Sequence, residues 1–324
     1  MSDHEHDVSA VEVTLPSEGR DDIVVPFHTE KAGARGRLVR LGSCVNQILT
    51  DHDYPDPVAN FLGEAIALTG LIGTSLKFDG KLILQTKSDG PISMLVVDFS
   101  TPSALRAYAS FDVSKVQEMA DAPLEMKQWL GKGYMALTVD QGSDMERYQG
   151  IVEMEGETLG DVAEKYFMQS EQIPSLVRLH TAKHFQPSDD SEATWQWRSG
   201  GVLVQYLTSQ GGVGGEGDVD ALSEAQEEDW RRARILGDSV EVHELLDPQL
   251  EPERLLFRLY HEEGVRVFEA QDLEARCSCS RERVKAMLAN FSSQDREDMV
   301  EDGKISVTCE FCTRCYEFSE QDFG

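Results

Sequence analysis

Five of the six cysteines lie in the last fifty residues, and four of these form two close pairs. Cys277-Ser278-Cys279 is followed, after 29 intervening residues, by Cys309-Glu310-Phe311-Cys312. Two short cysteine pairs separated by a helix-sized spacer are able to place four thiolates around one tetrahedral zinc ion. The spacing therefore predicts one Zn²⁺ bound by Cys277, Cys279, Cys309 and Cys312.

Such a site is closed, because four protein ligands leave no open position for a water molecule, and this disfavours hydrolytic catalysis at the metal. Its sulfurs can be oxidised, and a thiolate that becomes part of a disulfide no longer binds the metal. Loss of zinc removes roughly 10–16 kcal/mol of apparent binding free energy, which is as large as the stability of a whole domain. Oxidation is therefore expected to unfold this module. The alternative is a passive zinc knuckle that only folds the C-terminus.

The two remaining cysteines have different surroundings. Cys315 follows Cys312 after two residues, so it is an alternate ligand, a spare thiol or a residue without a role. Cys44 lies among apolar residues, which favours a buried and inert thiol. A thiol–disulfide oxidoreductase that uses Cys309 and Cys312 is a further hypothesis, but this pair lacks the strand-to-helix context of that redox motif. No other motif indicates an enzyme.

The charge balance limits the partners. Asp and Glu number 59 against 30 Lys and Arg, which gives a formal net charge of −29. This charge repels phosphate backbones and anionic membranes, so we expect neither nucleic acid nor membrane as a partner. The first twenty residues are polar and acidic and do not resemble a signal peptide. We therefore expect a cytoplasmic protein, in a compartment where thiols are kept reduced.

The chain divides into four parts by composition, and the fold class is α+β. We expect a disordered tail over 1–20, a mixed strand–helix core domain over 21–209, an acidic and partly helical linker over 210–270, and a small zinc-binding redox-switch domain over 271–324. The linker opens with the glycine-rich stretch 210–217, which predicts a hinge.

Within the core domain, Pro55-Asp56-Pro57 predicts the start of a helix with Asp56 as N-cap. Apolar residues then recur at three- and four-residue spacing as far as Leu76. A second helix is predicted over 160–172. Strands are predicted at 82–86, 92–99, 105–111, 134–139, 148–153, 175–181 and 201–207.

The linker is strongly acidic, because residues 216–257 hold 13 acidic and 4 basic side chains. Few large apolar residues accompany so much charge. The segment is therefore expected to have low intrinsic stability and to fold only by docking on its neighbours. The alternative is a solvated acidic linker with short helices.

The sequence resembles the redox-regulated heat-shock holdase family, the thirty-three-kilodalton chaperonins. The strongest matching block is Cys277-Ser278-Cys279-Ser280-Arg281-Glu282-Arg283, followed by Cys309-Glu310-Phe311-Cys312 with Tyr316 and Phe318. Upstream motifs follow in the family's order, among them Leu62-Gly63-Glu64-Ala65, Tyr148-Gln149-Gly150-Ile151-Val152 and Gly200-Gly201-Val202-Leu203-Val204-Gln205. The resemblance extends from about residue 21 to residue 318, and Cys315 departs from the family's pattern.

The resemblance implies an ATP-independent holdase chaperone that is inactive while reduced and zinc-bound. It implies that oxidation forms the disulfides Cys277–Cys279 and Cys309–Cys312, ejects zinc and loosens the preceding linker. The expected partners are unfolded or partly unfolded client proteins, with a homodimer in the oxidised state. The competing hypothesis is a constitutive zinc-knuckle scaffold or binding protein without redox switching.

Overall fold

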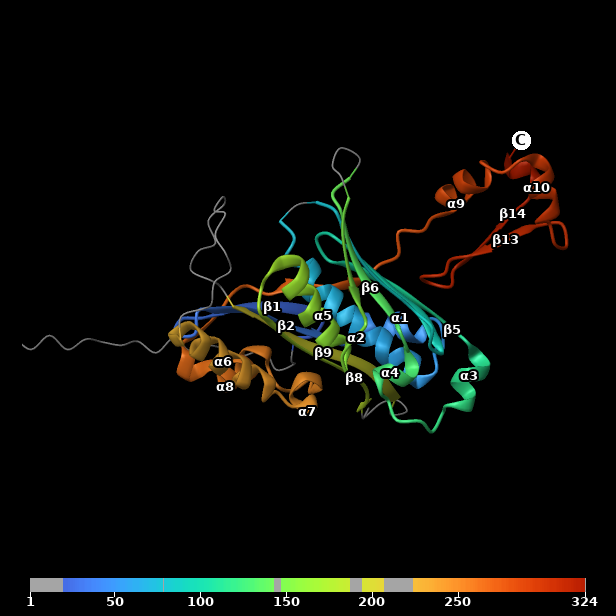
Figure 1. Ribbon diagram of the computed structural model, residues 1–324. Helices are drawn as coiled ribbons and strands as arrows, with labels where there is room; N and C mark the ends of the chain where they lie inside the picture. Colours follow the sequence, from blue (N-terminus) through green and yellow to red (C-terminus); the bar gives the residue numbers. More distant parts are fainter. Residues whose placement is uncertain (1–19, 78, 143–146, 187–193, 207–223, 324) are drawn as a thin grey trace, which may run out of the picture.

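The computed structural model describes residues 20–77, 79–142, 147–186, 194–206 and 224–323, which form two six-stranded sheets, a set of short helices and a small C-terminal module (Figure 1). The tail predicted for residues 1–20 and the hinge predicted for 210–217 lie outside the described residues, apart from Arg20. The mixed α+β class is confirmed by these elements.

The first sheet has the strand order β10-β1-β2-β9-β8, and β11 also pairs with β1. All of its neighbouring strands are antiparallel. Its strands are β1 (Ile23–Thr29), β2 (Ala34–Leu41), β8 (Ser175–Gln186), β9 (Thr194–Tyr206), β10 (Val265–Val267) and β11 (Gln271–Asp272). We call it sheet A. Both β10 and β11 come from the far end of the sequence, so the chain returns to the core after the linker helices.

The second sheet, sheet B, has the order β12-β5-β4-β3-β6-β7. Only the β12–β5 pair is parallel. Its strands are β3 (Lys81–Ser88), β4 (Ile92–Ser100), β5 (Ala104–Phe111), β6 (Gly133–Asp140), β7 (Tyr148–Glu153) and β12 (Glu274–Ala275). The strands predicted in this half of the core are all present. Strands β3 and β7 alternate buried and more exposed residues with the period of a half-buried strand, whereas β4 carries a continuous buried run.

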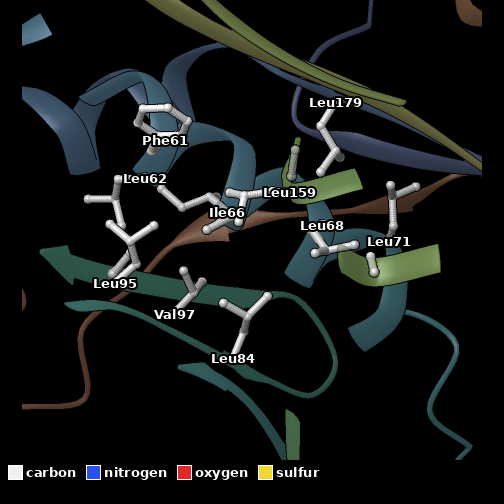
Figure 2. Close-up of a cluster of buried hydrophobic side chains, with 14 of the residues drawn as sticks. Phe61, Leu62, Ile66, Leu68, Leu71, Leu84, Leu95, Val97, Leu159 and Leu179 are labelled. Atoms are coloured by element: carbon white, nitrogen blue, oxygen red, sulfur yellow. The ribbon is translucent and has the colours of Figure 1, made fainter. Parts of the chain in front are cut away.

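Helix α2 (Asp56–Gly73) forms the centre of the core, with sheet A on one side and sheet B on the other. Figure 2 shows its apolar side chains between Leu84, Leu95 and Val97 of sheet B and Leu179 of sheet A. The predicted helix is confirmed, but the predicted cap is wrong. Pro55 occupies the N-cap position without a side-chain hydrogen bond, and Asp56 is already helical. A proline there fixes φ for the helix entry without a capping oxygen.

The remaining core helices are short. They are α1 (Ser43–Thr50), α3 (Val113–Glu118), α4 (Met126–Trp129) and α5 (Leu159–Tyr166). The helix predicted over 160–172 ends as an α-helix at Tyr166 and continues as a π-helix over Phe167–Glu171, with Gln172 in the left-handed conformation at φ 57°. Strands β8 and β9 run beyond their predicted limits, because they pair with each other along their whole length.

After the core come α6 (Glu224–Asp238), α7 (Val242–Leu246) and α8 (Pro252–Tyr260), followed by a 3₁₀ turn at His261–Glu263. These helices cover the face of sheet A that is turned away from α2 (Figure 1). The C-terminal module contains α9 (Arg281–Leu288), α10 (Ser293–Asp298), the hairpin β13 (Ile305–Thr308) and β14 (Cys315–Phe318), and a 3₁₀ turn at Glu320–Phe323. Among the described residues, no helix combines the length and the apolar character needed to cross a bilayer.

One carboxyl group of the core is placed at an energetic cost. Glu64 lies on the central helix α2, and burial raises its pKa to about 8. The folded protein thus keeps this proton up to about pH 8, whereas the unfolded chain releases it near the ordinary glutamate pKa of 4.5. The folded state binds more protons between these values, so this group lowers the stability as the pH rises through that window.

We expect Glu64→Gln to stabilise the protein increasingly from about pH 5 to pH 8, and by a constant amount above pH 8. The gain is on the order of 3 kcal/mol, because one pKa unit is worth about 1.4 kcal/mol and the side chain keeps partial exposure. Urea unfolding at several pH values measures it, with the exposed Glu118→Gln as the control. A difference between Glu64→Gln and the parent that does not depend on pH would contradict the expected proton linkage.

Candidate metal centre

The first cysteine pair lies where the chain leaves sheet B. Strand β12 ends at Ala275, and Cys277 follows two residues later. Ser280 is the N-cap of α9, and its hydroxyl accepts a hydrogen bond from the backbone N–H of Arg283. The Arg283 guanidinium donates to the carbonyl oxygen of Ser278 at 2.7 Å. The helix start and this hydrogen bond together fix the turn that presents Cys277 and Cys279.

The second pair lies at the end of the β13–β14 hairpin, whose register pairs Thr308 with Cys315. The backbone N–H of Cys309 donates to Arg314, and that of Thr313 donates back to Cys309. Thr313 takes a positive φ of 54°, which closes the loop tightly. This loop presents Cys309 and Cys312 on the side that faces the first pair.

The four predicted ligand atoms gather in one cluster, because the Sγ atoms of Cys277, Cys279, Cys309 and Cys312 lie within 4.8 Å of one another. The Sγ atoms of Cys277 and Cys309 are 3.7 Å apart, and those of Cys279 and Cys312 are 3.4 Å apart. A zinc ion with four sulfurs at 2.3 Å gives sulfur–sulfur edges of about 3.8 Å. All four cysteines are free thiols. The spacing and the all-sulfur donor set therefore fit one tetrahedral Zn²⁺.

The thiols also polarise one another. Burial raises the pKa of Cys279, but hydrogen bonds from the Tyr316 hydroxyl and the neighbouring thiols outweigh this effect and lower the pKa to about 7. The Tyr316 hydroxyl donates to Cys279 Sγ at 3.2 Å. Burial, together with hydrogen bonds to the neighbouring thiols, raises the pKa of Cys312 to about 12. One sulfur of the cluster thus takes thiolate character near neutral pH. The thiolate is the form that binds metals and reacts with oxidants.

The hydrophobic core of the module is small. Its buried apolar residues are Leu288, Ile305, Tyr316 and Phe318. A core of this size does not offset the conformational entropy of folding some fifty residues. The sulfur cluster is therefore placed where a bound metal would supply most of the stability of the module.

The other two cysteines lie outside this cluster. Cys315 is exposed on β14. Cys44 is buried in α1, so the prediction of a buried thiol is confirmed, and burial raises the pKa of this thiol. Only a protonated, inaccessible thiol is expected at that position.

A second feature concerns the helices α6, α7 and α8. Their apolar side chains pack on the outer face of sheet A, and the shared cluster is large: it includes Ile23, Val25, Phe27, Leu38, Leu176, Val202 and Val204 from the sheet and Ala233, Leu245, Leu255, Leu256, Leu259 and Tyr260 from the helices. The expected docking of this acidic segment on a neighbour is therefore seen in the structure. If the helices left, the apolar sheet face would meet water.

Two buried arginines of sheet A hold this segment by its backbone. Arg40 on β2 is fully buried, and its guanidinium donates to the carbonyl oxygens of Glu244, Leu245 and Leu250. Arg198 on β9 donates to the carbonyl of Leu246 at 2.7 Å. The carbonyls of Glu244, Leu245 and Leu246 lie at the C-terminal end of α7, which carries the negative end of the helix dipole, and that of Leu250 lies in the following turn.

Neither arginine was expected from the spacing of motifs. The signal that does exist is a single charge inside an otherwise apolar strand, as in Leu38-Val39-Arg40-Leu41. Burial lowers the pKa of Arg40 to about 10, yet the group remains charged near neutral pH. A buried charge of this kind needs partners, and here the partners are supplied by the linker.

Comparison with known proteins agrees with this arrangement. The sequence model of the Hsp33 protein family matches residues 22–319. The 33 kDa chaperonin of Caulobacter vibrioides strain NA1000 / CB15N is 44% identical over 299 residues, which cover 91% of this chain and 94% of that protein. The 33 kDa chaperonin of Escherichia coli O7:K1 is 34% identical over 296 residues, with 91% of each chain covered.

Among solved structures, the crystal structure of the 33 kDa chaperonin from Thermotoga maritima superimposes with a TM-score of 0.71 at 20% sequence identity. The alignment covers 93% of this chain and 96% of that one, so the likeness extends to the whole fold. The match of the family over most of the sequence and the identity to the two bacterial chaperonins lead to one assignment. This chain belongs to the Hsp33 family.

Proposed function

We propose that this protein is a redox-regulated, ATP-independent holdase chaperone of the cytoplasm. In the reduced state Cys277, Cys279, Cys309 and Cys312 hold one Zn²⁺, and the protein is inactive. Oxidation forms the disulfides Cys277–Cys279 and Cys309–Cys312, the metal leaves, and the module of residues 271–324 unfolds. The linker of residues 210–270 then separates from the core and uncovers an apolar surface. The oxidised protein forms a homodimer, and this surface binds unfolding client proteins.

The observation that carries this proposal is the sulfur cluster with its tetrahedral spacing beside a small hydrophobic cluster, whose buried members among the described residues are Leu288, Ile305, Tyr316 and Phe318. A metal in such a site would supply folding free energy, and zinc coordination by thiolates is lost on oxidation. When bound, zinc supplies no reaction but holds the two loops together. Tyr316 orients one sulfur, and Arg283 fixes the turn of the first pair.

The covered face of sheet A supports the second half of the proposal. It is apolar, and its cover is an acidic segment held in part by two buried arginines that donate to backbone carbonyls of α7 and the following turn. Arg198 is also paired with Asp21. Burying these arginines costs the desolvation of their charges. When the linker leaves, water can replace its carbonyls as hydrogen-bond partners. The open sheet face then matches the chemistry of exposed apolar segments in unfolded clients.

The test uses purified full-length protein in two states. We expect the protein treated with peroxide at mild heat to suppress aggregation of a chemically denatured client, and the reduced, zinc-loaded protein to leave it unaffected. In parallel, one zinc per chain should be released as four thiols disappear, and peptide mapping should find the two disulfides named above. Equal activity in both states, with zinc retained, would support the constitutive zinc-knuckle scaffold instead.

A further inference from the structure

The C-terminal module does not lie against the linker helices that it would control. In Figure 1 the module with α9, α10, β13 and β14 lies beside β5, at the opposite end of the molecule from α6 and α8. A signal from the sulfur cluster must therefore travel along the chain segment that joins them. This segment, residues 265–276, is bound to both sheets.

The segment is held at several points along its length. Strand β10 pairs with β1, where Val267 lies opposite Phe27, Arg266 opposite His28 and Val265 opposite Thr29. The N–H of Leu273 then donates to the carbonyl of Asp22 at 2.7 Å. Strand β12 finally pairs with β5, where the N–H of Glu274 donates to Ser103 and that of Arg276 donates to Leu105, each at 2.9 Å. Residues 265–276 are thus hydrogen-bonded to the core at both ends and in the middle, up to the residue before Cys277. We call this segment the zipper.

The module itself contacts the core through the loop of the second cysteine pair. Phe311 lies between Cys309 and Cys312 in the sequence, and its ring packs edge-on against Tyr108 of β5, with the centroids 4.8 Å apart. The guanidinium of Arg106, two residues earlier on the same face of β5, lies 3.9 Å from the Phe311 ring centroid. Edge-to-face aromatic contact and cation–π contact are both favourable in these geometries.

Arg106 also reaches the first cysteine pair, and it is held in place from behind. Its guanidinium donates to the hydroxyl of Ser278, between Cys277 and Cys279, at 3.2 Å. Asp98, its cross-strand neighbour on β4, accepts from Arg106 Nε at 2.8 Å. One core side chain, held in place by Asp98, therefore touches both loops that carry the sulfurs.

The contact is local. Beside it lies a cleft of about 430 Å³, lined by Gln47 and Ile48 of α1, Leu105, Cys277 and Cys312 among others. Breaking the contact of Phe311 therefore leaves the hydrophobic core of both sheets intact.

We infer that Arg106 and Tyr108 form a dock for the Phe311 loop, and that this dock keeps the zipper of residues 265–276 closed from its Cys277 end. When the sulfur loops separate, Phe311 leaves the dock, β12 parts from β5, and opening proceeds from residue 276 toward β10 and the linker helices. This inference deepens the proposed function and rests on its metal-controlled module.

The test measures backbone amide exchange in the full-length, reduced, zinc-loaded protein. Phe311→Ala and Arg106→Gln should each accelerate exchange at Glu274 and Arg276 by roughly tenfold, the scale of one aromatic plus one cation–π contact. The double variant should exchange no faster than the more affected single variant, because both changes break the same contact. Phe291→Ala, at an exposed aromatic of the same module, is the control.

The order of opening provides a second readout. On removal of zinc with a chelator, the unchanged protein should lose protection at Glu274 and Arg276 before it loses protection at Arg266 and Phe268, whose N–H groups face β1. Phe311→Ala alters no residue of the core, so it tests the dock even if Arg106→Gln fails to fold. Exchange at residues 274–276 that is unchanged in the variants overturns the dock, and so does protection that is lost first at β10.

Zinc content is measured on the same samples, which separates the two proposals. One zinc per chain with unchanged exchange in both variants overturns the dock and leaves the proposed function intact. Absence of zinc from the unchanged, reduced protein overturns the metal-controlled switch itself.

Discussion

Cys312→Ser is expected to abolish stable zinc binding and to unfold the C-terminal module in reducing buffer. A structural zinc site contributes about 10–16 kcal/mol of apparent binding free energy, so one of four ligands carries roughly 3 kcal/mol. The affinity for zinc should fall by a hundredfold or more. The module has four buried apolar side chains and no comparable substitute for this free energy.

The measurement is zinc content with amide exchange over residues 277–318. The matched control is Cys315→Ser, because Cys315 is exposed and lies outside the sulfur cluster. This control should keep one zinc per chain and a protected module. If the proposed switch is correct, Cys312→Ser should also suppress client aggregation without any oxidant. Full zinc occupancy in Cys312→Ser, or equal zinc loss in Cys315→Ser, would contradict the assignment of ligands.

Arg40→Met is expected to release the linker helices while the zinc module stays folded. The substitution removes three buried hydrogen bonds to carbonyls of Glu244, Leu245 and Leu250 and leaves those carbonyls without partners. Each buried carbonyl left without its hydrogen-bond partner costs about 1–3 kcal/mol. Since α7 has only five residues and packs mainly through Leu245 and Leu246, this loss exceeds what its own contacts supply.

Gly200 shows how closely α7 sits on the sheet: a Cβ atom there would lie 2.7 Å from the carbonyl oxygen of Leu245. A small displacement of α7 therefore breaks the whole contact. We expect faster amide exchange over residues 242–260, stronger binding of an apolar dye, and aggregation suppression by the reduced, zinc-loaded protein.

Arg37→Met is the matched control for Arg40→Met. Arg37 is on the same strand but belongs to the opposite face, and its Nε atom is buried without a hydrogen-bond partner. The control removes the same charge without touching the linker, so residues 242–260 should stay protected. Protection of these residues in Arg40→Met that equals the parent would show that apolar packing alone holds the linker.

The candidate metal site was predictable because its information is local. Two cysteines one or two residues apart must present their sulfurs on neighbouring loops, and only a soft metal or a disulfide uses such a set in a reducing compartment. The start of α9 was equally local, since Ser280 supplies a capping oxygen immediately before the helix. The strands β3–β7 followed from short apolar runs or alternation bounded by turn residues, which depend only on near neighbours along the chain.

The failures came from residues whose conformation depends on distant partners. Asp56 has the residue type of an N-cap, but its carboxylate accepts a hydrogen bond from Lys183 Nζ, far along the chain, at 2.6 Å. Pro55 occupies the N-cap position instead. Strand β9 begins at Thr194 because β8 extends beside it as far as Gln186, and a polar stretch gives no sign of this pairing. Strands β10, β11 and β12 are two or three residues long, too short for any periodic pattern.

The sequence by itself determined the donor set of the metal site, the acidic character of the linker and the α+β class, since each depends on residue types at short spacing. Only the tertiary structure decided what the linker covers, which buried arginines hold it, and that Phe311 meets Arg106 and Tyr108. The contacts of Arg40 and of Phe311 join residues some two hundred positions apart. Their free energy depends on burial and geometry that arise once the two sheets have closed around α2, and no local pattern encodes them.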